Sequence, residues 1–171
     1  CAGGGGKTWH LAAMMKNNGR IIAMDVEANK LNELKKRAKR AGVTCIETKP
    51  IASIQTINAL ANTADRVLLD VPCSGLGVIK RNQDAKWKLS LDFINKIKTL
   101  QQEILSGYSV MVKPGGLLVY STCSVLPSEN EKQVTTFLST NKNFELLEER
   151  SVLPSAGFDG FYMALMRRIE Q

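Results

Sequence analysis

The sequence predicts an α/β fold built around a mostly parallel, doubly wound sheet. Short apolar segments with the length of strands alternate with longer segments whose apolar residues recur at helical spacing. Two of the apolar segments, 20–25 and 66–70, end in an aspartate. Strands that alternate with helices of this length are typical of parallel sheets, because parallel neighbours need long crossover connections.

Each element can be justified in order along the chain. The segment 27–41 has apolar residues at helical spacing and stops at Gly42, which predicts a helix. A turn at 113–116 introduces the next strand, and acids beginning at Glu129 suit the start of a helix. The predicted strands are 20–25, 44–48, 66–70, 116–121, 144–148 and 161–168, of which the last two form an antiparallel end, and the predicted helices are 27–41, 91–112 and 129–139.

The composition indicates a folded domain with a basic surface. Of 171 residues, 44% are hydrophobic and 23% are charged, and 23 Lys and Arg against 16 Asp and Glu give a net charge of +7. These values suit one domain with a full core and argue against disorder. No apolar run approaches the roughly 20 residues that cross a bilayer, so we expect a soluble, cytoplasmic protein. The positive charge points to a nucleic acid only if other features agree.

Four single cysteines and one histidine limit the metal chemistry. The cysteines stand at positions 1, 45, 73 and 123, and no Cys-x-x-Cys pair occurs, so we expect no zinc site and reduced thiols. Pro72-Cys73 is typical of nucleobase deaminases, but Leu76 stands where their second cysteine would lie, and His10 lacks their His-x-Glu spacing. Cys45 lies in an apolar stretch and is expected to be a small buried hydrophobe.

The chain opens with the glycine run Cys1-Ala2-Gly3-Gly4-Gly5-Gly6-Lys7-Thr8. It matches the end of a phosphate loop, but Cys1 stands where that motif has its first glycine, which disfavours a phosphate-loop NTPase. Glycines before a helix let a ligand approach the backbone, and helix N-terminal amides favour an anionic group. Asp25 lies 19 residues beyond Gly6, at a strand end where an acid can accept both hydroxyls of a ribose. We therefore expect a nucleoside cofactor, either NAD or S-adenosylmethionine.

Two cysteines follow predicted strands. Asp70-Val71-Pro72-Cys73-Ser74-Gly75 follows the strand 66–70, and Ser121-Thr122-Cys123-Ser124 follows the strand 116–121. Open α/β sheets build their ligand sites at the carboxyl ends of parallel strands. We therefore expect the two thiols to face one crevice. Tight packing at a strand end would explain either cysteine alone, but their joint placement beside a cofactor loop favours a function.

These motifs resemble those of the Sun/Fmu-type RNA cytosine-5 methyltransferases over almost the whole chain. Residues 1–8 are similar to the family's C-A-x-P-G-G-K-T, 70–75 to its D-x-P-C-S-G, and 121–124 to its second cysteine motif. The segment 80–87 and the closing Asp159-Gly160-Phe161-Tyr162 match as well. Within the family, the nearest resemblance is to bacterial 16S ribosomal RNA methyltransferases of the B type.

The resemblance implies a Rossmann-like methyltransferase fold that uses S-adenosylmethionine as cofactor and RNA as substrate. Cys123 matches the nucleophile that adds to cytosine C6, and Cys73 matches the cysteine that resolves the adduct. Asp70 and Lys7 match residues that contact the methionine part of the cofactor or the target base. The cofactor contacts implied in this way are Cys1, Ala2, Gly3, Gly4, Gly5, Gly6, Lys7, Asp25 and Asp70.

The resemblance also implies how the chain is organised. The family's central first strand lies ahead of the glycine run, so we expect residues 1–171 to be a shortened catalytic domain with six strands and a gap, and an RNA-binding part upstream. We expect a monomer. Gly4 stands in place of the family's usual proline, and no acid occurs near 48–50, which leaves the adenine contact unassigned.

Basic residues after the first cysteine motif are expected to contact RNA. Lys80, Arg81 and Lys86 would bind phosphates at the mouth of the site. Trp87 could stack on a base, although packing against a helix is the preferred interpretation.

Three alternatives stay open. A tRNA could be the substrate in place of ribosomal RNA. A DNA cytosine-5 methyltransferase would use the cysteine of a Pro-Cys pair, here Cys73, as nucleophile. A basic RNA-binding module without catalysis would bind no S-adenosylmethionine.

Overall fold

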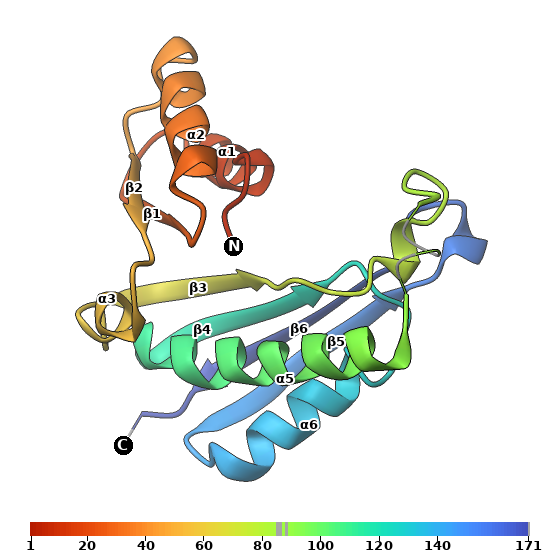
Figure 1. Ribbon diagram of the computed structural model, residues 1–171. Helices are drawn as coiled ribbons and strands as arrows, with labels where there is room; N and C mark the ends of the chain where they lie inside the picture. Colours follow the sequence, from red (N-terminus) through yellow and green to blue (C-terminus); the bar gives the residue numbers. More distant parts are fainter. Residues whose placement is uncertain (85–86, 88, 171) are drawn as a thin grey trace. The chain divides into compact units, whose positions relative to one another are not determined.

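The computed structural model describes residues 1–84, 87 and 89–170, and the chain divides into two compact units, Cys1–Thr56 and Ile57–Gln171 (Figure 1). Each unit combines strands with helices, and parallel strand pairs occur in both. The predicted α/β class is confirmed. Within the described residues, no helix is long and apolar enough to cross a membrane.

The first unit is a parallel strand pair with helices. Its elements are α1 (Gly6–Met14), β1 (Ile21–Asp25), α2 (Ala28–Arg40) and β2 (Ile46–Pro50), followed by α3 (Ile54–Asn58) at the boundary between the units. The two strands pair in register from Ile21 with Ile46 to Asp25 with Pro50. The helical spacing recognised in the sequence is confirmed, because α2 buries Leu31 and Leu34 against Ala23 of β1.

The strand predicted at 44–48 begins two residues later than expected. Asn17 has a left-handed backbone with φ of 59°, and its side-chain oxygen accepts the N–H groups of Thr44 and Cys45 at 2.9 and 3.1 Å. These two amides are satisfied by a side chain instead of a neighbouring strand, so the ladder starts at Ile46. Cys45 itself is buried, as predicted.

The second unit is a four-stranded sheet with two long helices on one face (Figure 1). Its elements are β3 (Ala64–Asp70), η1 (Leu76–Val78), α5 (Leu91–Tyr108), η2 (Ser109–Met111), β4 (Val112–Thr122), α6 (Glu131–Thr140), β5 (Phe144–Val152), η3 (Pro154–Ala156) and β6 (Phe161–Arg168). The strand order is β3-β4-β6-β5. β3 and β4 are parallel, and β6 is antiparallel to both of its neighbours, which confirms the antiparallel last strand.

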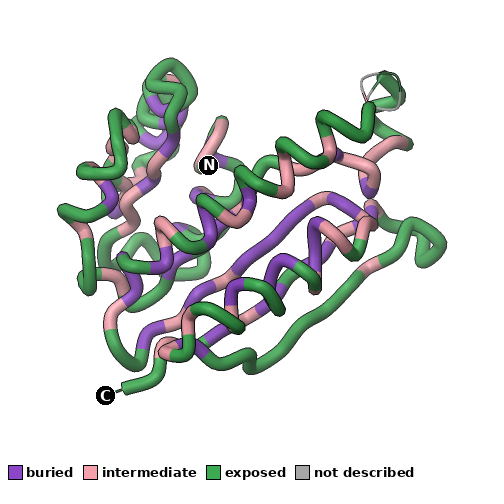
Figure 2. The backbone as a smooth tube through the Cα atoms, turned by 60° about the horizontal axis from the view of Figure 1, so that its bottom comes forward, coloured by how far each residue is buried: buried purple, intermediate pink, exposed green. Residues whose placement is uncertain are grey.

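The core of this unit lies between the helices and the central strands. Buried residues recur among exposed ones along α5 and α6 and alternate along much of β4 and β6, whereas β5 is mostly exposed (Figure 2). Leu105 of α5 and Phe137 of α6 are fully buried, as are Leu118 and Tyr120 of β4. β4 is therefore held from both sides by its strand partners and covered by helices, which makes its carboxyl end a rigid base for a loop.

Three boundaries differ from the prediction for identifiable reasons. The helix predicted at 91–112 ends at Tyr108, because the carbonyls of Val110 and Met111 accept amides from residues 62 and 63. The turn predicted at 113–116 is a bulge inside β4: the pairing shifts between Ala64 and Arg66 of β3. The helix predicted from Glu129 begins at Glu131, and Glu129 lies buried in the preceding turn.

The six predicted strands are all present but fall into two hydrogen-bonded sheets, β1-β2 and β3-β4-β6-β5. Within residues 1–84, 87 and 89–170, no strand pairing joins β1 or β2 to the four-stranded sheet. The short helix α3 and the three 3₁₀ helices were not predicted.

Candidate active site

The glycine run forms a loop whose backbone is accessible to a ligand. Gly3 and Gly5 have left-handed φ angles of 54° and 91°, and Gly5 caps the start of α1. A Cβ at Gly5 would lie 2.6 Å from Nε1 of Trp9 and 2.7 Å from Cγ of Leu34, so only glycine fits there. Around Gly4, by contrast, a Cβ would meet no atom within 4 Å. The loop is therefore shaped on one side by packing and open on the other.

Asp25 ties this loop to the end of β1. Its two carboxylate oxygens accept the backbone N–H of Gly3 at 2.8 Å and that of Glu27 at 2.9 Å. Burial acts to raise the pKa of Asp25, but these two hydrogen bonds and the nearby charges of the terminal amine and Lys30 outweigh it and bring the pKa below its ordinary value. An ionised carboxylate with free lone pairs at a strand end, beside glycines with open space, fits a nucleoside cofactor.

The other predicted residues of the cofactor loop are less constrained. Ala2 donates its backbone N–H to the carbonyl of Met24 at 2.9 Å, which anchors the loop to β1. Cys1, Gly6 and Lys7 are exposed, and Lys7 lies in the first turn of α1. The contact of Lys7 with the cofactor or the target base stays a prediction.

The structure brings Cys73 and Cys123 together. β3 and β4 pair up to Asp70 and Ser121, and the loops that follow continue side by side. The two sulfur atoms lie 3.1 Å apart, within hydrogen-bonding distance for sulfur, and both cysteines are half-buried and not in a disulfide. Asp70 stands at the head of the first loop, where its Oδ1 accepts the hydroxyl of Ser121 at 3.3 Å. Two thiols at the carboxyl ends of adjacent parallel strands form the centre of the candidate site.

The surroundings of Cys73 favour its protonated form. The hydrogen bond with Cys123, burial, and electrostatic repulsion from Cys123 raise the pKa of Cys73 well above its ordinary value. A negative charge on one sulfur disfavours a negative charge on the other, so the two adjacent thiols do not easily ionise together. Cys73 therefore ionises less readily than an ordinary cysteine.

Two glycines, Gly77 and Gly160, allow the segment 159–162 to pack close to the Cys123 loop. Gly77 donates its N–H to the carbonyl of Cys123 at 2.9 Å, and its own carbonyl accepts the N–H of Gly160 at 2.7 Å. A Cβ on Gly77 would lie 2.2 Å from the carbonyl oxygen of Gly160. The match of Asp159-Gly160-Phe161-Tyr162 to the family motif thus has a structural reason, since this strand entry supports the loop of Cys123.

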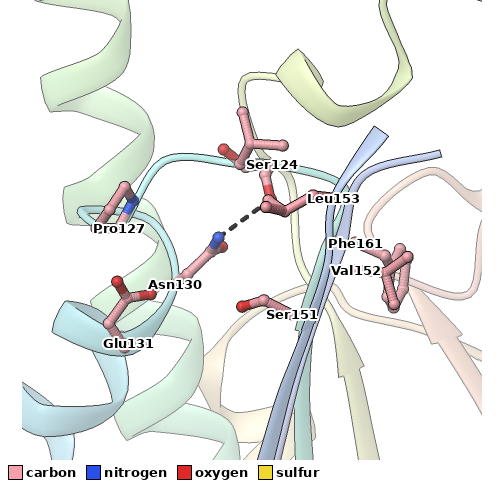
Figure 3. Close-up of a pocket in the computed structure, with 9 residues that line it drawn as sticks. Ser124, Pro127, Asn130, Glu131, Ser151, Val152, Leu153 and Phe161 are labelled. Atoms are coloured by element: carbon pink, nitrogen blue, oxygen red, sulfur yellow. Dashed lines mark hydrogen bonds between the residues drawn. The ribbon is translucent and has the colours of Figure 1, made fainter. Parts of the chain in front are cut away.

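Side chains behind the Cys123 loop brace it further (Figure 3). Asn130 donates from Nδ2 to the carbonyl of Ser124 at 3.1 Å, and its Oδ1 accepts the hydroxyl of Thr122 at 2.6 Å. A cavity of about 170 Å³ opens beside these residues, lined also by Ser151 and Phe161. The side-chain oxygen and nitrogen of Asn130 therefore both bind the Cys123 loop, and its side chain does not cap α6.

Sequence reasoning missed Glu129 as part of this site. It was interpreted as an acid at the start of a helix, whereas the structure buries its side chain completely against Ser74 and Ser124. The sequence feature that could have pointed to Glu129 is the serine that directly follows each cysteine. A buried hydroxyl needs a hydrogen-bond partner, and a carboxylate can serve as one. Gln101 of α5, also fully buried, completes this set.

The structure gives the surroundings of the basic residues, whose contacts with RNA stay predictions. Lys80 is exposed, and Arg81 forms a salt bridge with Asp159 at 2.7 Å, which links the basic segment to the closing motif. Lys86 lies outside the described residues. The prediction that Trp87 packs against a helix was wrong, because this residue is 79% exposed. Within the described residues, no group of three His, Cys, Asp or Glu side chains could hold a metal ion.

The positive charge is distributed unevenly between the two units. Residues 1–56 contain ten Lys and Arg against four Asp and Glu, whereas residues 57–171 contain thirteen against twelve. The exposed face of α2 carries much of this excess, including Lys35, Lys36 and Lys39. The net charge of +7 therefore belongs mainly to the unit with the glycine loop, and the unit with the thiols is nearly neutral.

Known proteins similar to this chain belong to the family that the sequence motifs resemble. The family described as 16S rRNA methyltransferase RsmB/F matches residues 1–167. Ribosomal RNA small subunit methyltransferase B of Pasteurella multocida is 37% identical over 99% of this chain and 41% of its own length. The protein of the same name from Vibrio cholerae is 35% identical over 98% of this chain and 40% of its own length. The chain thus spans about two fifths of the curated relatives it matches.

Solved structures show the same likeness. The crystal structure of PH0851 superposes on all of this chain with a TM-score of 0.89 and 36% identity, and the match covers 41% of that protein. NSun6 from Pyrococcus horikoshii, solved with SFG, has a TM-score of 0.87 and 29% identity, with 47% of that protein covered. The agreement of motifs, profile and fold over nearly every residue leads to one conclusion: the chain belongs to the 16S rRNA methyltransferase RsmB/F family.

Proposed function

We propose that this chain is the catalytic part of an S-adenosylmethionine-dependent RNA methyltransferase that forms 5-methylcytosine in 16S ribosomal RNA. The observation that carries the proposal is the 3.1 Å approach of the Cys73 and Cys123 sulfurs at the carboxyl ends of β3 and β4. Family membership supports an RNA methyltransferase, and the names of the relatives support ribosomal RNA of the small subunit.

A thiolate is needed because cytosine C5 is too weak a nucleophile to take a methyl group by itself. In the proposed reaction the Cys123 sulfur bonds to C6, and the electron pair of the C5–C6 double bond moves to C5. C5 would then form the new bond to the methyl carbon, while the bond from that carbon to the sulfonium sulfur of S-adenosylmethionine would break and leave its electron pair on that sulfur, giving S-adenosylhomocysteine. Removal of the C5 proton lets the double bond re-form and breaks the bond between C6 and sulfur, which returns Cys123 as a thiolate.

Cys73 is suited to the second half of this reaction. Its pKa is raised first by the hydrogen bond with Cys123, and the charge on Cys123 also contributes. Both causes disappear once Cys123 is bonded to the base, since that sulfur is then neutral and no longer accepts strongly. The pKa of Cys73 therefore falls when the adduct forms, which allows its thiolate to help remove the C5 proton directly or through water. The raised pKa of Cys73 before the adduct forms disfavours Cys73 as the attacking group.

The first unit would hold the cofactor. Gly3, Gly4 and Gly6 border open space, and the buried Gly5 shapes the turn between them. Cys1, Ala2 and Lys7 lie in the same segment, and Asp25 would accept the ribose hydroxyls. S-adenosylmethionine, when bound, supplies a methyl group that is already electrophilic. Asp70 would contact its methionine part or the target base, and Lys80, Arg81 and Lys86 would contact RNA phosphates.

The test is methyl transfer with identification of the product. The protein is incubated with isotopically methyl-labelled S-adenosylmethionine and 16S ribosomal RNA, and the RNA is digested to nucleosides for mass spectrometry. We expect labelled 5-methylcytidine from the wild type and none from Cys123→Ser. Label in another nucleoside would contradict the proposed chemistry. Binding of RNA without binding of S-adenosylmethionine in calorimetry would instead favour a module without catalysis.

A further inference from the structure

The buried carboxylate of Glu129 joins the loops that carry the two thiols. Glu129 lies in the turn before α6, and none of its surface is exposed. Its Oε2 accepts the backbone N–H of Ser74 at 2.8 Å and an N–H of the Gln101 side chain at 3.0 Å. Its Oε1 accepts the hydroxyl of Ser124 at 2.8 Å. One carboxylate thus holds the residue that directly follows each cysteine.

The surroundings fix this carboxylate in place. Gln101 of α5 also donates to the carbonyl of Pro72 at 2.9 Å, and the hydroxyl of Tyr120 in β4 donates to the carbonyl of Glu129 at 2.7 Å. The hydroxyls of Ser74 and Ser124 lie 3.1 Å apart. A buried carboxylate is costly unless its hydrogen bonds are made, and here both oxygens are occupied. The network is therefore rigid as well as buried.

Near the two cysteines, this network links the Cys73 loop to the Cys123 loop. Backbone hydrogen bonds join the two loops from Val71 to Ser121, at 3.1 Å, and from Gly77 to Cys123, at 2.9 Å. Between these points, side chains link the loops: the two cysteine sulfurs, the hydroxyls of Ser74 and Ser124, and the carboxylate of Glu129, which accepts the N–H of Ser74. A shift of the carboxylate would therefore let one loop move against the other where the sulfurs lie.

We propose that Glu129 is a positioning residue that sets the distance between the thiols of Cys73 and Cys123. The proposal deepens the proposed function and rests on it, because two thiols that act on one base must stay in register with each other. Glu129 acts through Ser74 and Ser124 and need not touch the base. A misplacement of about 1 Å in an active site can cost on the order of 100-fold in rate, so a clamp of this kind has a measurable effect.

The test uses the rate at which a mild thiol oxidant such as diamide links Cys73 to Cys123, read by peptide mapping. This rate reports the sulfur distance and needs neither RNA nor cofactor. We expect Glu129→Ala to slow the cross-link by about tenfold or more, since the N–H of Ser74 and the hydroxyl of Ser124 lose their shared partner. The matched control is Glu131→Ala, two residues along in the first turn of α6, which should cross-link like the wild type.

Glu129→Gln separates position from charge. The amide oxygen of the new glutamine can accept the backbone N–H of Ser74 and the side-chain N–H of Gln101. Its NH₂ group can donate to the hydroxyl oxygen of Ser124, and the Ser124 hydroxyl can then donate its own proton to the hydroxyl oxygen of Ser74. We therefore expect Glu129→Gln to restore cross-linking to within about threefold of the wild type, because the geometry is kept while the charge is lost. In methyl transfer, Glu129→Ala should lower kcat with little change in KM for RNA, and Glu129→Gln should recover kcat.

Three results would overturn the proposal. A folded Glu129→Ala protein that cross-links at the wild-type rate would show that the clamp does not set the distance. A Glu129→Gln protein as impaired as the alanine variant would show that charge, not position, matters. If Glu129→Ala does not fold, Ser124→Ala removes one arm only, and unchanged cross-linking there would equally contradict the proposal. A wild type that cross-links normally but makes no 5-methylcytidine would instead count against the proposed function alone.

Discussion

Replacing Gly77 with alanine should destabilise the second unit and disturb the Cys123 loop. The new Cβ would lie 2.2 Å from the carbonyl oxygen of Gly160 and 2.8 Å from that of Cys123. Both contacts are with backbone, so no side chain can rotate away. The two hydrogen bonds that Gly77 makes, at 2.9 Å to Cys123 and 2.7 Å from Gly160, would be strained or lost.

The magnitude follows from these contacts. Overpacking a closed site costs about 1–3 kcal/mol, and each hydrogen bond lost adds roughly 1 kcal/mol, which gives a loss of about 3–5 kcal/mol in the free energy of unfolding. This is a large part of the roughly 5–15 kcal/mol that stabilises a typical domain. The assay is urea unfolding followed by circular dichroism, with the diamide cross-link of Cys73 to Cys123 as a local readout.

A matched control is available in the same chain. At Gly6, in the first turn of α1, a Cβ would meet no atom within 4 Å, so Gly6→Ala should change the free energy of unfolding by less than about 0.5 kcal/mol. The reasoning would be refuted if Gly77→Ala unfolded within about 1 kcal/mol of the wild type and kept the wild-type cross-linking rate. That outcome would mean that the contact between Gly77 and Gly160 does not hold the site.

Three further predictions concern charge and protonation. Because hydrogen bonds hold the pKa of Asp25 below its ordinary value, its carboxylate stabilises the fold above about pH 4, and this contribution is lost as the pH falls through the lowered value. Unfolding free energies measured across this range should show the loss in the wild type and not in Asp25→Asn. Alkylation of Cys73 by iodoacetamide should be slow at pH 8 and faster in Cys123→Ala, which removes the largest cause of its raised pKa; an unchanged rate would contradict that cause. Changing Lys35, Lys36 and Lys39 to glutamate should weaken RNA binding and lower the slope of log affinity against log salt by about 2–3, and an unchanged slope would show that α2 does not contact phosphates.

The order of strands and helices could be predicted from the sequence because it depends on local periodicity. Leu31 and Leu34 mark the buried face of α2, and the aspartates at 25 and 70 mark strand ends, which the structure confirms. Several boundaries could not be predicted, because they depend on contacts between distant residues. The side-chain oxygen of Asn17 accepts the backbone N–H groups of Thr44 and Cys45. No pattern within either segment predicts these hydrogen bonds.

The candidate site shows the same division. The two cysteine motifs predicted that Cys73 and Cys123 would meet, because parallel strands place their carboxyl ends side by side, and the structure agrees. Glu129 was misinterpreted, since an acid before a helix usually serves the helix dipole, and only the folded chain shows its partners 55 and 28 residues away. Trp87 was expected to pack against a helix, but it is largely exposed.

The assignment of Cys123 as nucleophile is tested most directly by trapping the covalent adduct. RNA in which the target cytosine is replaced by 5-fluorocytosine should stop the reaction after methyl transfer, because fluorine cannot leave C5 as a proton does. The account predicts an adduct, seen as a band shift in denaturing gels, with the wild type and with Cys73→Ala, and none with Cys123→Ala. An adduct that survives Cys123→Ala and is lost in Cys73→Ala would contradict it.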